Sequence, residues 1–123
     1  MEYTYNVSIE MRCTTITPSG IYSLQDIKNL ISLVTSDPDY NPQFNVLLNL
    51  REVKYTPLVS EIIEISDFIV KMKQSFRAKT AIITKSEVKY LMFKLSAHYT
   101  SKQGLQSNVF KDIKIAKDWL KEE

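Results

Sequence analysis

Short apolar runs alternate with longer segments of helical periodicity along this chain, and that alternation restricts its fold more than any other feature. Residues 46–50 and 80–84 are nearly continuous apolar runs of strand length, as expected for strands that are covered on both faces. Residues 106–110 form a short last strand. Strands that alternate with helices pair in parallel through right-handed crossovers. The sequence therefore predicts an α/β domain with a mixed, mostly parallel sheet and residues 46–50 at its centre.

The N-terminal segment follows a different pattern, with apolar and polar residues in strict alternation. Four β-forming side chains occupy every second position: Tyr3, Tyr5, Val7 and Ile9. This period of two is typical of a half-buried strand. Residues 13–18 supply a second strand after a three-residue link, which is short enough for a hairpin. We expect this hairpin to be the only antiparallel pair of the sheet.

Polar residues mark where the helices begin and end. Ser23 followed by Asp26 predicts the start of a helix over residues 23–36, and Pro38 forbids its continuation. Thr56 before Pro57 predicts an N-cap and first helical position for a second helix.

The later helices carry apolar stripes at steps of three and four. The second helix has six such residues: Leu58, Ile62, Ile65, Ile69, Met72 and Phe76. Ser86 is the expected cap of a third helix whose stripe consists of Val88, Leu91, Met92, Leu95 and Tyr99. Gly104 should end that segment in a left-handed conformation, and Asp112 should cap a last helix. The predicted order is β-β-α-β-α-β-α-β-α.

Length and composition indicate one globular domain over residues 1–123. Hydrophobic residues make up 44% and charged residues 24%, so the chain can bury enough apolar surface to offset its ordering entropy. No apolar stretch approaches the roughly 20 residues of a membrane-spanning helix. The N-terminus lacks the basic start and apolar core of a signal peptide. We therefore expect a cytoplasmic location.

Charge is unevenly distributed along the chain. Residues 1–50 carry two basic and five acidic side chains, and the remainder carries fourteen and nine. The basic excess is concentrated in seven residues: Lys71, Lys73, Arg77, Lys79, Lys85, Lys89 and Lys94. Such a patch attracts phosphates or anionic lipid heads, which leaves an anionic ligand and peripheral membrane contact open. The alternative, which we favour, is that these lysines occupy helix ends and solvated faces.

The sequence contains no recognisable catalytic constellation. One His and one Cys leave only scattered carboxylates as metal ligands, so we expect no metal. Gly20 and Gly104 belong to no phosphate-binding loop, so no cofactor is expected. The aromatic residues are dispersed and do not cluster with Arg, which argues against nucleic acid as a partner.

Three stretches resemble the SpoIIAA-like family, a relative of STAS domains that is also compared with Sec14-type lipid carriers. They are Asp37-Pro38-Asp39-Tyr40-Asn41-Pro42, Val46-Leu47-Leu48-Asn49-Leu50-Arg51-Glu52-Val53, and Val109-Phe110-Lys111-Asp112-Ile113 with Ala116 and Trp119-Leu120. The resemblance spans nearly the whole chain. It implies a SpoIIAA-like, STAS-type sheet with flanking helices. None of the three stretches is catalytic, so the resemblance implies a fold rather than a reaction.

Ligands of open α/β sheets settle outside the carboxyl ends of the parallel strands, which directs attention to residues 51–60 and 84–86. The candidate ligand-binding residues are Arg51, Tyr55, Thr56, Ser60, Lys85, Ser86 and His98. The hypothesis is a noncatalytic binding or regulatory module for a small apolar, amphipathic or anionic ligand. We expect its apolar pocket between the second and third helices, lined by Ile62, Leu91 and Leu95.

Two alternatives remain open at this point. The first is a protein-interaction switch of the STAS type, in which phosphorylation of Thr56 or Ser60 blocks a protein partner. In that family a phosphorylatable Ser follows an Asp at this place, whereas this chain has Pro57-Leu58. The second is a hydrolase or transferase in which His98 carries a proton.

Overall fold

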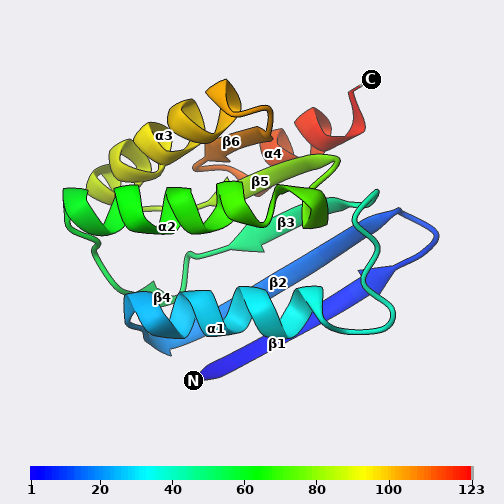
Figure 1. Cartoon of the computed structure of the whole chain (residues 1–123), viewed down its shortest axis with the longest axis horizontal. Coiled ribbons are helices and arrows are strands. Elements are labelled where there is room, and N and C mark those ends of the chain that lie inside the picture. Colours follow the sequence, from blue (N-terminus) through cyan, green and yellow to red (C-terminus); the bar gives the residue numbers. More distant parts are fainter. Residues whose placement is uncertain (123) are drawn as a thin grey trace.

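The computed structural model describes residues 1–122 as a helix-covered sheet (Figure 1). The sheet has six strands in the order β1-β2-β3-β5-β6, with β4 paired to β2. The strand bounds are Glu2–Ser8 (β1), Cys13–Ile21 (β2), Asn45–Asn49 (β3), Val53–Lys54 (β4), Lys79–Ile83 (β5) and Gln106–Phe110 (β6). Within the described residues β1 and β2 form the one antiparallel pair, and the other pairs are parallel. The predicted α/β class, the hairpin and the central position of residues 46–50 are confirmed.

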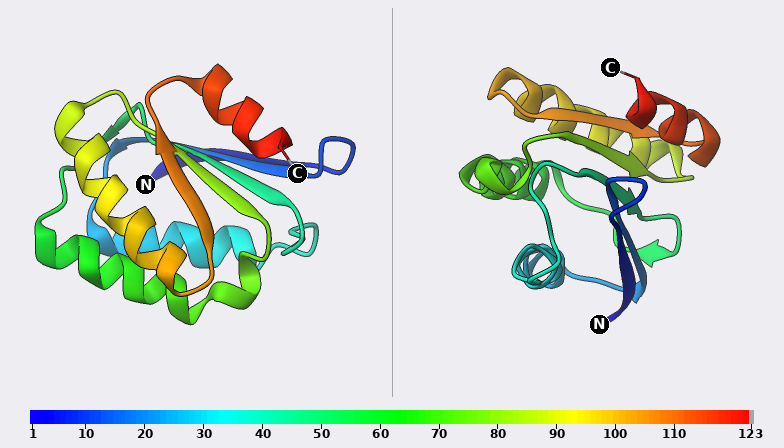
Figure 2. Two further views of the ribbon diagram at one scale, coloured as in Figure 1. Left: turned by 90° about the horizontal axis from the view of Figure 1, so that it is seen from above. Right: turned by 90° about the vertical axis from the view of Figure 1, so that its right-hand side faces the viewer.

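Helices cover both faces of the sheet unequally. Their bounds are Leu24–Thr35 (α1), Val59–Lys71 (α2), Glu87–Lys102 (α3) and Ile113–Lys121 (α4), with a 3-10 turn at Lys73–Ser75 (η1). The end-on view of Figure 2 shows α1 and α2 on one side of the sheet and α4 on the other. Because β2, β3, β5 and β6 follow one another across the sheet, right-handed crossovers bring α1, α2 and α3 to the same face.

Three of the predicted helix starts are confirmed by their side-chain caps. Ser23 Oγ accepts from Asp26 N at 3.1 Å while Asp26 Oδ2 accepts from Ser23 N at 3.0 Å. Ser86 Oγ accepts from Lys89 N at 3.4 Å. Asp112 Oδ1 accepts from the two amides of Lys114 and Ile115 at 2.7 and 3.2 Å. Each cap satisfies amides that have no partner within the first turn of the helix.

The predicted start of the second helix is wrong. Thr56 is exposed and Pro57 is buried in extended chain, and α2 begins at Val59 with Leu58 in the capping position. The Leu58 amide donates to Glu61 Oε1 at 2.9 Å, whereas the first-turn amides that the Thr56 hydroxyl was expected to satisfy receive no bond from the side chain of the capping residue. The short strand β4 draws the preceding chain into the sheet, which delays the helix. The helix also ends at Lys71, short of Phe76.

Most of the apolar stripe predicted to bury the third helix faces solvent instead, although Met92 packs against the core. Leu91 and Leu95 are 60% and 54% exposed. The buried residues of α3 are Phe93, Ser96, Ala97 and Thr100. Ser96 Oγ lies 2.7 Å from Ser66 Oγ on α2, and small side chains at this contact let the two helices approach closely. The helix therefore has two apolar faces, and the one with the small residues packs inward.

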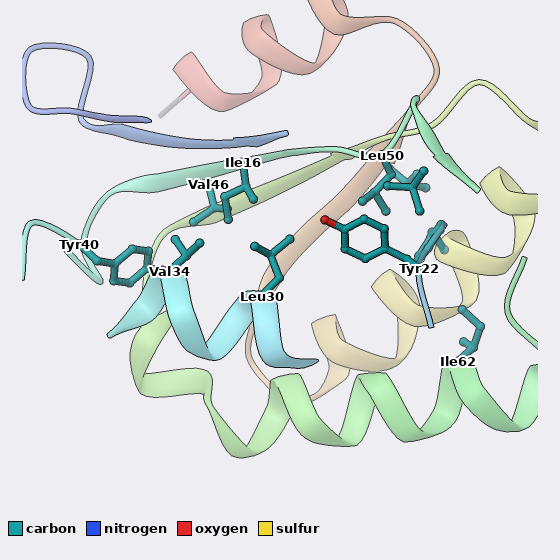
Figure 3. Close-up of a cluster of buried hydrophobic side chains, with 11 residues drawn as sticks. Ile16, Tyr22, Leu30, Val34, Tyr40, Val46, Leu50 and Ile62 are labelled. Atoms are coloured by element: carbon teal, nitrogen blue, oxygen red, sulfur yellow. The ribbon is translucent and has the colours of Figure 1, made fainter. Parts of the chain in front are cut away.

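Two hydrophobic clusters lie on opposite faces of the sheet. The larger cluster, beneath α1, α2 and α3, is shown in part in Figure 3 and includes Ile16, Leu30, Val34, Val46, Ile62 and Phe93. The smaller cluster, beneath α4, consists of Leu47, Ala81, Ile83, Ala116 and Leu120. Successive residues of β3, Val46 and Leu47, point into different clusters, as strand geometry requires.

A hydrogen bond ties the hairpin to the turn after α1 and should make stability sensitive to acid. The Tyr5 hydroxyl donates to Asp37 Oδ2, and Asp39 N donates to Asp37 Oδ1 at 2.8 Å. These bonds lower the pKa of Asp37 below its ordinary value of 3.8. The carboxylate therefore stabilises the fold above that value, and the contribution is lost as pH falls through the lowered pKa.

The Tyr5→Phe substitution should raise the pKa of Asp37 toward its ordinary value and weaken the acid dependence of the urea midpoint between about pH 6 and pH 2. An NMR titration of the Asp37 carboxyl measures the pKa directly. Tyr3→Phe is the matched control, because Tyr3 stacks beside Tyr5 with ring centroids 6.2 Å apart. An unchanged Asp37 pKa in Tyr5→Phe would contradict the assignment.

Candidate functional site

An apolar cavity of about 90 Å³ lies between the sheet and the helices α1, α2 and α3. Its walls come from α1 (Ile27, Leu30, Ile31), from α2 (Ile62, Ile65, Ile69), from the strands (Ile16, Val46, Leu48, Ile82) and from Phe93 of α3. Apolar cavities of this order stay dry and accept small apolar molecules. Most voids inside proteins are smaller than this, because interiors are close-packed. The cavity is therefore the first candidate for a ligand site.

An ion pair links α1 and α2 next to residues that line the cavity. Lys28 Nζ of α1 lies 2.6 Å from Glu64 Oε2 of α2. The same ammonium lies 5.7 Å from the centre of the Phe68 ring. Glu64 is more than half exposed, and an ion pair of this kind contributes little to stability. The ion pair therefore adds little to the hold on α1, which comes mainly from the buried side chains of Leu30 and Val34.

Three tyrosines bring hydroxyl groups to the walls of the cavity. The Tyr22 hydroxyl donates to the Glu2 carbonyl, and the Tyr40 hydroxyl donates to the Ser75 carbonyl at 2.6 Å. The Tyr55 hydroxyl is buried and has no hydrogen-bond partner within 3.5 Å among the described residues, although the Glu61 carboxylate lies close enough to act on it. Buried polar groups are nearly always paired, so an unpaired donor on an apolar wall marks a position for a ligand acceptor.

Burial keeps these hydroxyls in the neutral, proton-donating form. It raises the pKa of Tyr40 to about 12. Burial also raises the pKa of Tyr55, and the nearby Glu61 carboxylate raises it further. Glu61 Oε1 already accepts from the Leu58 amide at 2.9 Å. At neutral pH, Tyr55 is therefore a hydrogen-bond donor and not a base.

A second, polar depression of about 260 Å³ lies at the carboxyl edge of the strands. It brings together three of the residues predicted from the sequence: Arg51, Lys85 and Ser86. Arg51 Nε donates to Asn49 Oδ1 at 3.0 Å, and Lys85 Nζ lies 3.6 Å from Glu52 Oε1. Each cation therefore has a partner within the chain, but both remain accessible at this edge.

The other four predicted site residues do not form one site. Tyr55 lines the apolar cavity, whereas Thr56 and Ser60 are exposed near the start of α2 and line none of the depressions described. His98 is exposed on α3. The predicted pocket between the second and third helices is correct in part: residues of α2 and α3 line the cavity, but α1 lines it too, and Leu91 and Leu95 point to solvent. Of the three predicted lining residues, Ile62 does line the cavity.

Sequence reasoning missed the walls contributed by Tyr22, Tyr40 and α1. The apolar positions of α1 were recognisable as a core stripe from their spacing. That spacing does not indicate how close α1 lies to α2. The position of Tyr55 at the end of β4 was also hidden, because a two-residue strand has no recognisable period.

Within residues 1–122, no three His, Cys, Asp or Glu side chains converge as metal ligands would. None of the helices in that range has the length and apolarity needed to cross a bilayer. Burial raises the pKa of the Cys13 thiol, against smaller opposing effects of Thr15 and Lys117. The thiol is therefore protonated at neutral pH and poorly suited to act as a nucleophile.

Comparison with known proteins supports the fold. No family model matches the chain, and no curated protein matches it either. The crystal structure of an uncharacterised protein of the DUF3478 family from Shewanella loihica, described as having a SpoIIAA-like fold, superposes with a TM-score of 0.64. The match has 18% sequence identity and covers 97% of this chain and 92% of the other. The chain therefore has the SpoIIAA-like fold.

Proposed function

We propose that the protein is a noncatalytic binding module that takes a small amphipathic molecule into the cavity beneath α1, α2 and α3. The observation that carries the proposal is the unpaired Tyr55 hydroxyl on an otherwise apolar wall. An apolar molecule alone would leave that donor unsatisfied. A ligand with one acceptor oxygen, such as a carboxylate or a ketone, would satisfy it while its apolar part fills the cavity.

The size of the cavity limits the class of ligand. About 90 Å³ suits a short aliphatic chain or one small ring rather than a whole lipid. A larger apolar ligand would have to displace α1 from α2. The exposed Lys28–Glu64 pair opposes that displacement only weakly.

The polar depression at the sheet edge suits an anionic group of such a ligand. Leu50 and Val53 line both the cavity and this depression, so the two spaces share a wall. Arg51 and Lys85 lie on the polar side of that wall. Because Leu50 and Val53 separate the two spaces, an anion held in the depression would be distinct from the acceptor group that meets Tyr55 in the cavity.

The alternatives have less support. The exposed hydroxyls of Thr56 and Ser60 are accessible to a kinase, which is compatible with a phosphorylation switch. Intact-mass measurement on protein from native cells tests that alternative. The His98 ring makes no hydrogen bond among the described residues. No contact therefore supports the hypothesis of a hydrolase or transferase that uses His98.

Binding of hexanoate and benzene tests the proposed function. We expect both probes to shift the methyl NMR signals of Leu30, Val46 and Ile62. Tyr55→Phe should weaken hexanoate binding about tenfold, as expected for loss of one hydrogen bond to a charged group, and leave benzene binding unchanged. Tyr40→Phe is the matched control, because the Tyr40 hydroxyl is already bonded to Ser75.

Native mass spectrometry and organic extraction of freshly purified protein identify any ligand that is carried through purification. Failure of both probes to bind at millimolar concentration would overturn the proposal. Equal loss of hexanoate binding in Tyr55→Phe and Tyr40→Phe would indicate that both substitutions act through protein stability, and not through a hydrogen bond from Tyr55 to the ligand.

A further inference from the structure

The polar depression at the carboxyl edge of the sheet carries a concentrated positive charge. It lies between the loop after β3 and the first turn of α3, and Figure 1 shows the start of α3 at the end of the molecule where β4 lies. Four basic side chains and one acidic side chain line it: Arg51, Lys54, Lys85, Lys89 and Glu52. An anion in the depression therefore meets a lining whose net charge is +3.

The partners that these cations have within the chain leave most of their hydrogen-bond donors free. Arg51 donates through Nε to Asn49 Oδ1 at 3.0 Å, and its two terminal nitrogens have no partner among residues 1–122. Lys89 Nζ donates to a backbone carbonyl of β4 at 2.7 Å, which uses one of its three hydrogens. Lys85 Nζ lies 3.6 Å from the Glu52 carboxylate, and both side chains are about two-thirds exposed, so this pair is weak and easily exchanged for a ligand.

The first turn of α3 adds backbone donors at the same edge. The Ser86 hydroxyl accepts from Lys89 N at 3.4 Å, and the amides of residues 85–88 have no acceptor among the described residues. The acidic residue of this turn, Glu87, is paired with Lys111. Amide dipoles at the start of a helix favour an anion. Every helix has such a start, however, so this feature alone does not define a site.

A buried hydroxyl without a partner distinguishes this edge from an ordinary helix start. Thr84 is 1% exposed and lines the depression, and its hydroxyl makes no hydrogen bond among residues 1–122. The Thr84 amide donates to the Phe110 carbonyl at 3.0 Å, so the extended geometry of β5 continues through this residue. Ile83 points into the cluster beneath α4, and the next side chain therefore points to the opposite side, where α3 and the depression lie. Since buried hydroxyls are nearly always hydrogen-bonded, Thr84 offers an unused donor to a ligand in the depression.

The number of donors favours phosphate over carboxylate. Arg51, Thr84 and Lys85 approach the depression from two loops, and the first-turn amides of α3 approach it from a third direction. A carboxylate has two oxygens and one charge, whereas a phosphate monoester has three free oxygens and a charge of about −1.5 to −2 at pH 7. Its oxygens also suit bidentate binding by a guanidinium. We propose that the depression is a binding site for a phosphate group, apart from the acceptor position beside Tyr55.

Amide NMR titration with inorganic phosphate at constant ionic strength tests the site. We expect saturable shifts confined to residues 50–54 and 84–89. Thr84→Val and Lys85→Gln should each raise the dissociation constant about tenfold, because each removes one hydrogen bond to a charged group. Thr14→Val is the matched control for the first variant, because the Thr14 hydroxyl is also buried and unpaired among the described residues but lies at the amino ends of the parallel strands. Lys102→Gln is the control for the second, because Lys102 is exposed in the last turn of α3.

Urea denaturation of the four variants checks that the fold is retained. The absence of saturable shifts at millimolar phosphate would overturn the proposal. So would phosphate binding that Thr84→Val and Lys85→Gln leave unchanged, or that the two controls weaken equally. Acetate that binds as tightly as phosphate would overturn the choice of anion. Tyr55→Phe should leave phosphate binding unchanged, so failure of this site is distinguishable from failure of the cavity.

Two further measurements distinguish the sources of a phosphate group. Competition by glycerol phosphate, without flotation of the protein on vesicles that contain phosphatidic acid, would identify a soluble phosphate ester. Flotation that Lys85→Gln abolishes and Lys102→Gln retains would identify a lipid headgroup.

Discussion

Ala116→Leu is expected to lower the free energy of unfolding by about 1–3 kcal/mol, whereas Ala97→Leu should leave it unchanged or raise it. Both alanines lie on helices and are nearly or fully buried. Ala116 has no exposed surface and packs against the smaller cluster beneath α4, so three added carbons have to displace their neighbours. Ala97 lines the cavity, so the same carbons enter empty space and gain about 0.8 kcal/mol for each buried methylene, less the cost of fixing the side chain.

Urea denaturation of the two variants measures the difference. Ala97→Leu should also abolish binding of benzene, because the side chain occupies the space that the probe needs. The two variants control for each other, because the same substitution is made at a buried helical position in both. Equal destabilisation of the two variants would show that the cavity closes in solution.

Tyr55→Phe is expected to raise the free energy of unfolding by about 1 kcal/mol, and Tyr40→Phe to lower it by a similar amount. The hydroxyl of Tyr55 is removed from water without gaining a partner, so its deletion relieves a desolvation cost. The hydroxyl of Tyr40 donates to the Ser75 carbonyl at 2.6 Å, and its deletion leaves that carbonyl without this donor.

Thermal or urea unfolding in the absence of ligand gives both values. The opposite signs matter more than the magnitudes, because the same chemical change is made in both variants. Destabilisation by Tyr55→Phe would mean that its hydroxyl finds a partner in solution, with Glu61 the nearest candidate.

The sequence predicted structure correctly where one local interaction, such as a helix cap, determines it. Ser23, Ser86 and Asp112 cap their helices as predicted, because a cap depends on residues within one turn. Gly104 has a φ of +96°, the left-handed conformation expected after a helix. The parallel pairing and the central place of residues 46–50 also followed from the alternation of elements, whereas β4 was not predicted.

The errors arose where distant parts of the chain compete. α3 offers one stripe through Leu91 and Leu95 and another through Phe93 and Ala97, and the sequence alone did not show which would pack inward. The close contact at Ser66 and Ser96 decides between them, and that contact joins residues 30 positions apart. Likewise, Thr56 was displaced as a cap because β4 holds the chain before α2 against β2.

The candidate site was only partly predictable for the same reason. Arg51, Lys85 and Ser86 share an edge because the carboxyl ends of parallel strands meet there, and this rule needs no side-chain detail. The apolar cavity depends on the distance between α1 and α2, which is set by all the side chains between them. His98 was chosen for its chemistry alone, and its exposed position on α3 does not bring it to either depression.

The sheet divides the interior into two layers, and these layers differ in how readily they open locally. The layer beneath α4 contains Ala81, Ile83 and Ala116, all without exposed surface, and holds the central strands from one side. The opposite layer contains the void, and its outermost helix is joined to the next by an exposed ion pair. Breathing of the native state should therefore be concentrated in α1, whose amides would exchange with solvent long before those of β3 and β5. A ligand would therefore enter the cavity through local opening of α1, while the layer beneath α4 keeps the central strands in place.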